Sequence, residues 1–264
     1  MYQKNNLYKL YKYNTSEKDY SSEIPDVTKK ITLENLNIAI NSCNKWDYFL
    51  DIGADNGHYS LPLLKKFRNG IAIEVNENEE LSNIEEQNET FKVYSKKIED
   101  IEINSKIDFI SLIDVFEHIP DPNKLTNKIS SFQDVGGVVF IIIPNTFYCG
   151  PAYESDIYYT KTKFGHIKHY TDKEMIDFFK NEKYELICDG FQEVKLSEVI
   201  RSKIRSVSRR DRKYKNKIMY KLIRPIVLFI LKIILNIFEF MSYKKELESN
   251  YKNSRSRFYV FKKY

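Results

Sequence analysis

Short apolar runs alternate with amphipathic stretches through the middle of the chain. Each run has the length of one buried strand, and the runs are YFLDIG, GIAIEV, FKVYS, IDFISLID and GGVVFIIIPN. The stretches between them are helix-like, and they are HYSLPLLKKF, ELSNIEEQNE and NKLTNKISSF. This alternation predicts an α/β fold with a doubly wound, mostly parallel sheet that carries helices on both faces.

Two further strands are expected, one on each side of a long interruption. Thr171 and Glu174 form the capping box Thr-x-x-Glu at the start of a helix, and the run YELICDG then reads as a sixth strand. The final residues, SRFYVFKKY, alternate as a strand does and have only the existing sheet to pair with. The expected sheet therefore has seven strands.

The pattern divides the chain into four segments. Residues 1–45 form an N-terminal extension that ends in a short helix over 31–45, and residues 46–195 form the α/β core. Residues 196–255 form a basic and apolar helical insert. Residues 256–264 return to the core as its last strand.

An acid and two glycines follow the first strand, in FLDIGADNGHYS. Ligands of open α/β sheets bind beyond the carboxyl ends of the strands, where a glycine turn can cradle a cofactor. Glu74 ends the second strand, 23 residues after Asp51, and a carboxylate there can accept hydrogen bonds from ribose hydroxyls. The turn reads D-x-G-x-x-x-G, and Asp55 inside it repels a pyrophosphate but suits an ammonium and a sulfonium. A tight turn that binds no ligand is the alternative.

Four segments follow one another in a specific order: FLDIGADNGHYS, IAIEV, DFISLIDVFEHIPDP and GGVVFIIIPN. In this order they resemble the class I S-adenosylmethionine (SAM)-dependent methyltransferases. The resemblance covers residues 46–195 and the last strand. It is closest to the branch of ubiquinone-pathway O-methyltransferases and methyltransferases of surface-glycan gene clusters. It implies a Rossmann-like sheet with its last strand antiparallel beside the sixth, and SAM as the cofactor.

The resemblance also implies a set of cofactor-binding residues: Asp51, Gly53, Ala54, Gly57, Glu74, Val75 and Asp114. Gly53 and Gly57 would flank the methionine moiety, with Asp51 near its amino group. Glu74 would bind the ribose hydroxyls, and Asp114 would lie beside the cofactor after the fourth strand.

The adenine contact departs from the family pattern. Residues 96–99 would border the adenine, and the family often has an acid here that contacts the adenine amino group. Lys97 stands at about that position, so Asp100 or a backbone carbonyl is left to make the contact.

Methyl transfer to a hydroxyl requires a base, and histidine suits that role near neutral pH. His118 follows the fourth strand, close to where the methyl group would project, and is the first candidate. His166 and His169, in a segment that can cover the site, are the next candidates. The alternative for His118 is a structural hydrogen bond at the start of the following helix. No metal is expected, because the H-x-x-H pair lies in a loop.

Positive charge is concentrated in one part of the chain. The whole chain carries a net charge of +5, yet residues Arg201 to Arg224 hold eleven Lys and Arg against the single acid Asp211. The remainder is therefore mildly acidic, and the basic block indicates an anionic partner of its own. Nucleic acid is not expected, because no aromatic platform or readout motif accompanies the arginines.

An apolar run follows the basic block. From Ile226 to Met241 the only polar residues are Lys232, Asn236 and Glu239, which share one face of a helix. We expect a helix that lies in a membrane interface, with residues 201–241 bound to anionic headgroups. A buried or oligomeric helix is the first alternative. A membrane span is disfavoured, because it would place the last strand on the far side of the bilayer.

These features together predict an O-methyltransferase that uses SAM and acts on a glycan or lipid-linked precursor. Its expected location is cytoplasmic and peripheral on the inner face of the cell membrane, since the N-terminus has no signal-like apolar region. Three cysteines without useful spacing predict neither disulfides nor a zinc site. Two alternatives remain, a small aromatic or quinone acceptor and a SAM-fold scaffold without catalysis.

Overall fold

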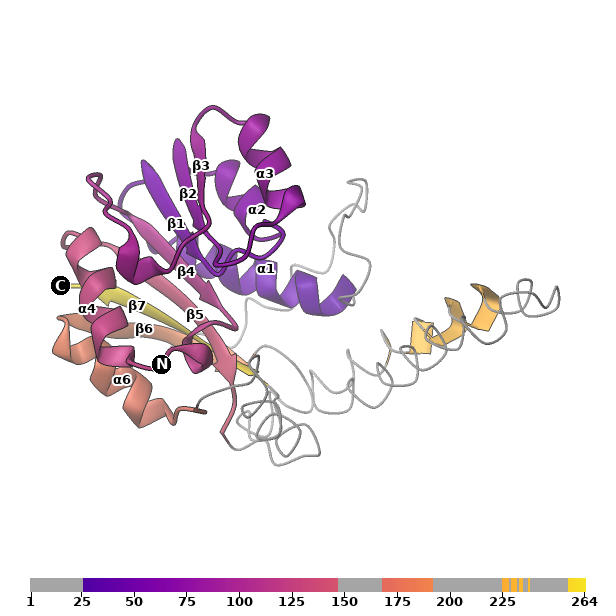
Figure 1. Ribbon diagram of the computed structural model, residues 1–264. Coiled ribbons are helices and arrows are strands. Elements are labelled where there is room, and N and C mark those ends of the chain that lie inside the picture. Colours follow the sequence, from indigo (N-terminus) through magenta and orange to yellow (C-terminus); the bar gives the residue numbers. More distant parts are fainter. Residues whose placement is uncertain are drawn as a thin grey trace.

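The computed structural model describes residues 26–146, 168–191 and 256–264, and helical positions between 225 and 237. Seven strands in these parts form one sheet (Figure 1). They are β1 (Tyr48–Ile52), β2 (Asn69–Ile73), β3 (Phe91–Tyr94), β4 (Phe109–Ile113), β5 (Val138–Pro144), β6 (Tyr184–Phe191) and β7 (Ser256–Lys263). The helices around it are α1 (Asp26–Ile40), α2 (Ser60–Leu64), α3 (Glu79–Glu86), α4 (Pro122–Phe132) and α6 (Asp172–Asn181), with the single-turn 3₁₀ helices η2 (Ile98–Asp100) and η3 (Phe116–His118).

The strand order is β3-β2-β1-β4-β5-β7-β6. Strands β1 to β5 pair in parallel, and β7 lies between β5 and β6 and runs antiparallel to both. This arrangement confirms the predicted α/β, doubly wound, Rossmann-like sheet with an antiparallel last strand. The central strands are apolar on both faces because both faces are covered, and in β5 every residue from Val138 to Ile143 is buried.

Helices cover the two faces of the sheet as two layers (Figure 1). On one face α4 and α6 bury Leu125, Ile129, Met175 and Phe179 against the strands. On the other face α1, α2 and α3 bury apolar residues such as Leu36, Leu63 and Leu81. Each layer has its own apolar core, so the sheet is enclosed from both sides.

The first helix lies earlier in the chain than predicted. The expected helix covered residues 31–45, whereas α1 covers Asp26–Ile40. A turn follows it, in which the Ser42 hydroxyl donates to the Ile38 carbonyl at 3.1 Å. Asn and Ser compete with helical backbone hydrogen bonds through their own side chains, which explains the earlier end. The division of the chain into four segments stays a prediction.

The last strand is an integral part of the core. The Phe261 ring stacks on Phe179 of α6, with 4.3 Å between ring centroids. The neighbouring Tyr184 hydroxyl, at the start of β6, donates to Gln133 Oε1 at 2.8 Å, and burial raises its pKa, so it stays protonated and keeps donating. The chain therefore closes its core with residues that lie far apart in the sequence.

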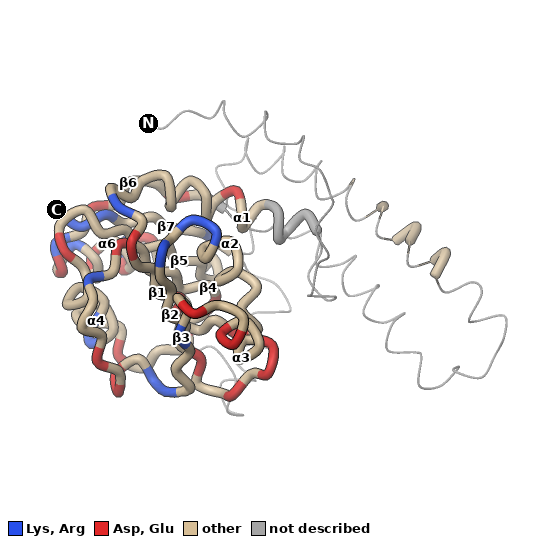
Figure 2. Tube along the Cα trace, turned by 90° about the horizontal axis from the view of Figure 1, so that it is seen from above, with Lys and Arg blue, Asp and Glu red and all other residues tan. Residues whose placement is uncertain are grey.

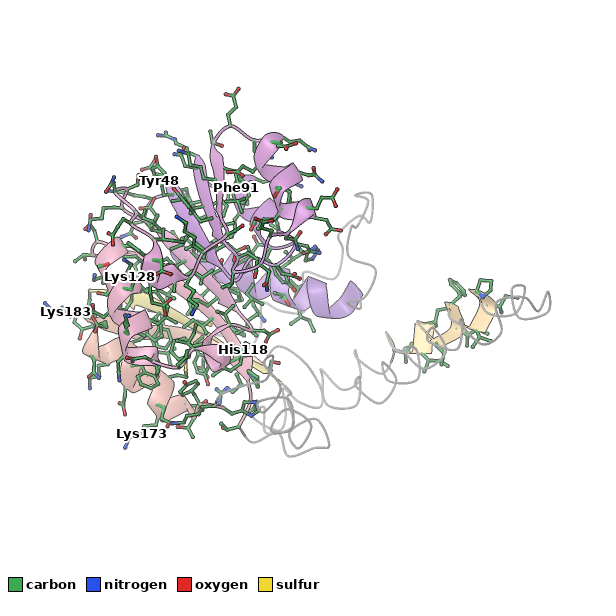
Figure 3. All side chains as sticks on the ribbon, viewed as in Figure 1. Tyr48, Phe91, His118, Lys128, Lys173 and Lys183 are labelled. Carbon is green, nitrogen blue, oxygen red and sulfur yellow. The ribbon has the colours of Figure 1, made fainter. Side chains whose placement is uncertain are left out.

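The parallel strands all end on the same side of the sheet, which is called its carboxyl edge below, and they all begin on the opposite side. Figure 3 shows Tyr48 and Phe91, the first residues of β1 and β3, in the upper part of the molecule, and His118 and Lys173 in the lower part. β7 begins at the carboxyl end of β5, because Ser256 is paired with Pro144. Phe191, the last residue of β6, is paired with Arg257. The segment between β6 and β7 therefore leaves and rejoins the sheet at the carboxyl edge.

Candidate active site

The turn after β1 has an unusual backbone. Gly53, Asp55 and Gly57 have φ angles of 72°, 48° and 78°, in the left-handed region that favours glycine. The amides of Gly53 and Ala54 both donate to the Ile73 carbonyl, at 2.7 and 3.1 Å. These bonds tie the turn to the end of β2 and hold it at the carboxyl edge of the sheet.

Close packing, in addition to the positive φ angles, favours glycine at positions 53 and 57. A Cβ on Gly53 would lie 2.3 Å from Cγ2 of Val115, in the loop after β4. A Cβ on Gly57 would lie 2.5 Å from Ile84 Cδ1 and 2.9 Å from Leu81 Cδ1, both on α3. The absence of a side chain at Gly57 therefore lets the turn pack against α3.

Asp51 is buried beneath the turn, with 3% of its surface exposed. Its Oδ2 accepts a hydrogen bond from the Ser60 hydroxyl at 2.6 Å, and its Oδ1 accepts one from the Ser111 hydroxyl at 2.7 Å. Burial raises the pKa of this carboxyl, the two serines lower it, and the charge of Glu74 raises it further. Asp51 thus braces β1 against α2 and β4. Its partners were not predicted, although a serine within the apolar run FISLI was a signal.

Glu74 closes the turn from the end of β2. Its Oε2 accepts a hydrogen bond from the Asp55 amide at 3.0 Å, and its Oε1 accepts one from the Asn76 amide at 3.2 Å. The side chain is only half-buried, and each carboxylate oxygen has a further lone pair for a hydroxyl. Beside it Val75 is 59% exposed, which leaves an apolar side chain open at the same edge.

The loop after β4 completes the carboxyl edge. Asp114 is exposed and has a φ of 55°, a conformation that non-glycine residues seldom adopt and that is found at functional sites. Its amide donates to the Ile142 carbonyl at 3.0 Å. In η2, Ile98 is buried, whereas Lys97 and Asp100 are exposed.

The candidate bases lie at the same edge. His118 ends η3 and is exposed, and Glu117 before it is fully buried. The Lys168 amide donates to the Glu117 carbonyl at 3.3 Å, so the structure brings the His169 segment against η3. His166 lies outside the described residues.

The segment before α6 is fixed by its own polar contacts. The predicted capping box forms, since Thr171 Oγ1 accepts from the Glu174 amide and Glu174 accepts from the Thr171 amide. Lys168 Nζ also bonds Glu174 Oε1 at 2.5 Å. Hydrogen bonds from Lys168 and Thr171 lower the pKa of Glu174 to about 2, so it is ionised at neutral pH. Tyr170 packs edge-on against Phe116, with 5.3 Å between ring centroids.

The charges at this edge suit one class of cofactor. Asp55, Glu74 and Asp114 present carboxylates near the turn, and Figure 2 shows further acidic residues along α3. These carboxylates favour a cofactor with a cationic centre and hydroxyl groups over one with a pyrophosphate. Within the described ranges, no group of three or more His, Cys, Asp or Glu residues could hold a metal ion.

The overlap at Gly53 predicts a coupling with Val115. Gly53→Ala should lower the free energy of unfolding by about 1–3 kcal/mol, because the new Cβ is strained and overlaps Val115. Val115→Ala in the same chain should recover part of this loss. Chemical denaturation in a double-mutant cycle measures the coupling. Gly136→Ala, at a φ of 92° beside Asn44, is the matched control that Val115→Ala should not rescue. Additive effects at Gly53 and Val115 would contradict the prediction.

The comparisons with known proteins agree with this geometry. Residues 22–189 match the family model described as a methyltransferase domain. No curated protein matches the chain by sequence.

Solved structures with the same fold include three methyltransferase-related enzymes. A candidate sarcosine dimethylglycine methyltransferase from Galdieria sulphuraria has a TM-score of 0.58 and 15% identity over 90% of this chain and 85% of its own. The cyclopropane synthase MmaA2 from Mycobacterium tuberculosis has a TM-score of 0.59 and 11% identity, over 88% and 84%. Coclaurine N-methyltransferase, solved with N-methylheliamine and S-adenosylhomocysteine (SAH), has a TM-score of 0.57 and 16% identity, over 94% and 76%.

The family model spans more than half of the chain and includes the glycine turn, Glu74 and η3. At these identities the solved structures support the fold alone. The chain belongs to the methyltransferase-domain family, and SAM is its cofactor.

Proposed function

We propose that this methyltransferase methylates a hydroxyl group of a glycan or lipid-linked precursor at the cytoplasmic face of a membrane. An exposed apolar stripe on one helix carries the membrane part of the proposal. Each residue of the stripe exposes between 36% and 65% of its surface, and the residues are Ile226, Phe229, Ile230, Ile233, Ile234 and Ile237. Their spacing of three and four residues aligns them along one helix face.

The surroundings of the stripe favour a lipid surface as its partner. Figures 1 and 2 show the described part of this helix apart from the sheet and its two helix layers. The preceding residues, Arg201 to Arg224, carry a net charge of +10, which complements anionic headgroups. No helix in the described part of the chain is long and apolar enough to cross a bilayer. A helix lying in the interface uses both the apolar stripe and the basic block.

The cofactor would be held by the carboxyl edge of β1, β2 and β4. When bound, SAM supplies an electrophilic methyl group on a sulfonium. Glu74 would accept hydrogen bonds from the ribose hydroxyls while its oxygens also hold the turn. Asp55 and Asp114 would offset the positive charge, and Ala54 and Val75 would border the cofactor. Asp51 would act beneath the turn as a brace, because it is buried and both of its oxygens accept hydrogen bonds from serine hydroxyls.

The acceptor would bind on the side of η3. His118 is exposed at the end of η3, so its imidazole can take the proton of an acceptor hydroxyl as the methyl group is transferred. The segment 168–171 would exclude water from one side of the acceptor. His169 and His166 are the next candidates for the base.

A second candidate function is methyl transfer to an amine. Glu117 is a fully buried carboxyl next to His118, and a carboxylate there would stabilise the positive charge that forms on a neutral amine as it takes the methyl group. Coclaurine N-methyltransferase, which shares the fold, is by name an enzyme that methylates nitrogen. The nature of the methylated product separates the two candidates.

Loss of Glu74 should weaken cofactor binding. Glu74→Ala should reduce the affinity for SAH by about 1–3 kcal/mol, because the ribose hydroxyls and the Asp55 amide lose a charged acceptor. Glu74→Gln should have a smaller effect. Isothermal titration calorimetry measures both. Glu89→Ala, an exposed acid just before β3, is the matched control. If the original protein and all three variants bind SAH with equal affinity, Glu74 does not bind the cofactor.

The acceptor is tested by mass analysis of cells. Cells that express the protein should contain an envelope glycan or lipid in which a methyl group replaces one hydroxyl hydrogen, so that its mass is greater by one CH₂ than in cells without the protein. His118→Ala should reduce turnover by about 10²–10⁴ and leave SAH affinity unchanged. An N-methylated product would support the second candidate, and a methylated quinone in place of a glycan would overturn the acceptor class. An unchanged rate for His118→Ala would assign the base to His169 or His166.

The apolar stripe should bind anionic vesicles. Sedimentation with vesicles of phosphatidylglycerol should carry the protein down, and vesicles of phosphatidylcholine should carry down less. Changing Phe229, Ile233 and Ile237 to Ser should release it, since each exposed apolar side chain contributes about 1.5–3 kcal/mol when buried. The matched control changes Val135 and Tyr264, exposed apolar residues elsewhere, to Ser. If the original chain binds neither vesicle type, and the three substitutions instead dissociate a dimer, the stripe is an oligomer contact.

A further inference from the structure

Arg257 is the centre of a charged cluster that joins three elements. It is the second residue of β7, and its side chain is 12% exposed. Its two terminal nitrogens bond Asp172 at the start of α6 and Asp189 near the end of β6. The planar guanidinium suits this arrangement, because its donors diverge toward two separate carboxylates.

Asp172 is fixed from more than one direction. Beside its bond with Arg257, its Oδ1 accepts a hydrogen bond from the Tyr259 hydroxyl at 2.6 Å. Burial and this bond to a carboxylate raise the pKa of Tyr259, so the phenol stays protonated and continues to donate. Asp172 is also the first residue of α6, where the helix dipole favours a negative charge. The start of α6 is therefore anchored to β7 by two side chains.

The cluster lies at the same edge as the site. Arg257 is paired with Ile143 near the end of β5 and with Phe191 at the end of β6. The carboxyl ends of these strands point toward the edge that carries the glycine turn and η3. Figure 3 agrees, since Lys173, next to Asp172, and His118 lie toward one end of the molecule.

A short covalent path leads from Asp172 to the acceptor side. Residues 168–171 precede Asp172 directly, and they include His169 and Tyr170. Tyr170 packs on Phe116 of η3, and the Lys168 amide donates to the Glu117 carbonyl. Holding Asp172 in place therefore holds one end of the segment that packs against η3.

We propose that Arg257 is a positioning residue for the acceptor side of the site, and that it acts through Asp172 on residues 168–171. This inference rests on the proposed placement of methyl transfer at η3. Asp189 bonds the other terminal nitrogen of Arg257 and orients the guanidinium, and it is not part of residues 168–172. The last strand thereby contributes to the geometry of the site without contacting cofactor or acceptor.

Hydrogen exchange and histidine spectra of the full chain test the proposal without an acceptor. Arg257→Gln should speed amide exchange of Lys168 and Met175 by about tenfold. The Lys168 amide bonds the Glu117 carbonyl of η3 and the Met175 amide bonds the Thr171 carbonyl, so both bonds depend on the position of residues 168–171. The ring signals of His118 and His169 should shift, and that of His58 should not. The chain has four histidines, so His→Gln variants assign the signals. SAH affinity should stay within about twofold of the original value.

Three further variants locate the effect. Asp172→Asn should reproduce the changes of Arg257→Gln, and Asp189→Asn should produce much smaller ones. Arg257→Lys should restore part of the protection, since one ammonium can reach one carboxylate but cannot span both. Arg68→Gln removes an exposed pair with Asp47, before β1, and is the matched control that should change neither readout.

Two results would overturn the proposal. In one, exchange rises equally across β5, β6 and residues 168–175, which would make Arg257 a general stabiliser of the sheet. In the other, the signals of His118 and His169 do not move. If Arg257→Gln does not fold, Asp172→Asn and Arg257→Lys give the same readouts. The hydrogen-exchange and histidine-spectrum results do not depend on whether His118 is the base or whether the protein binds vesicles. The proposed function can therefore fail while the role of Arg257 holds, and the reverse.

Discussion

The hydrogen bonds of the buried Asp51 carboxylate are the interaction on which the site depends. They join β1, α2 and β4 beneath the glycine turn, at the point where strands from both halves of the sheet meet. A buried carboxylate is costly unless hydrogen bonds compensate it, and two hydroxyls with almost no exposure do so here. The position of the turn relative to the loop after β4 follows from this brace, and the contact between Gly53 and Val115 closes the gap above it.

Much of the fold could be predicted from local patterns. Buried strands are short apolar runs, the capping box of α6 is a four-residue signal, and a left-handed turn needs glycine. Each of these features can be recognised from a few neighbouring residues. The pairing of Asp51 with Ser111 and that of Arg257 with Asp172 could not be predicted in this way, because the partners lie 60 and 85 residues apart in the sequence. Gly57 shows the same limit, since its position was predicted and its packing against α3 was not.

The chain separates charge of opposite sign along its length. The carboxylates of Asp55, Glu74 and Asp114 cluster at the carboxyl edge of the sheet, whereas the block from Arg201 to Arg224 is strongly basic. A cationic cofactor favours the first, and an anionic surface is the partner proposed for the second. At physiological ionic strength the Debye length is about 8 Å, so the two regions act independently unless they approach closely.

The place of β7 in the sheet has a consequence for how the protein is made. β6 cannot complete its pairing until β7 has been synthesised, because β7 lies between β5 and β6. The intervening residues, between Phe191 and Ser256, leave the ribosome first, and the two ends of this segment must then be brought together, which costs about 4 kcal/mol in chain entropy for a chain of this length. Until then one side of β5 is an unpaired apolar edge, which is a site for aggregation. The nascent chain is therefore exposed to aggregation along this side of β5 until its last strand emerges.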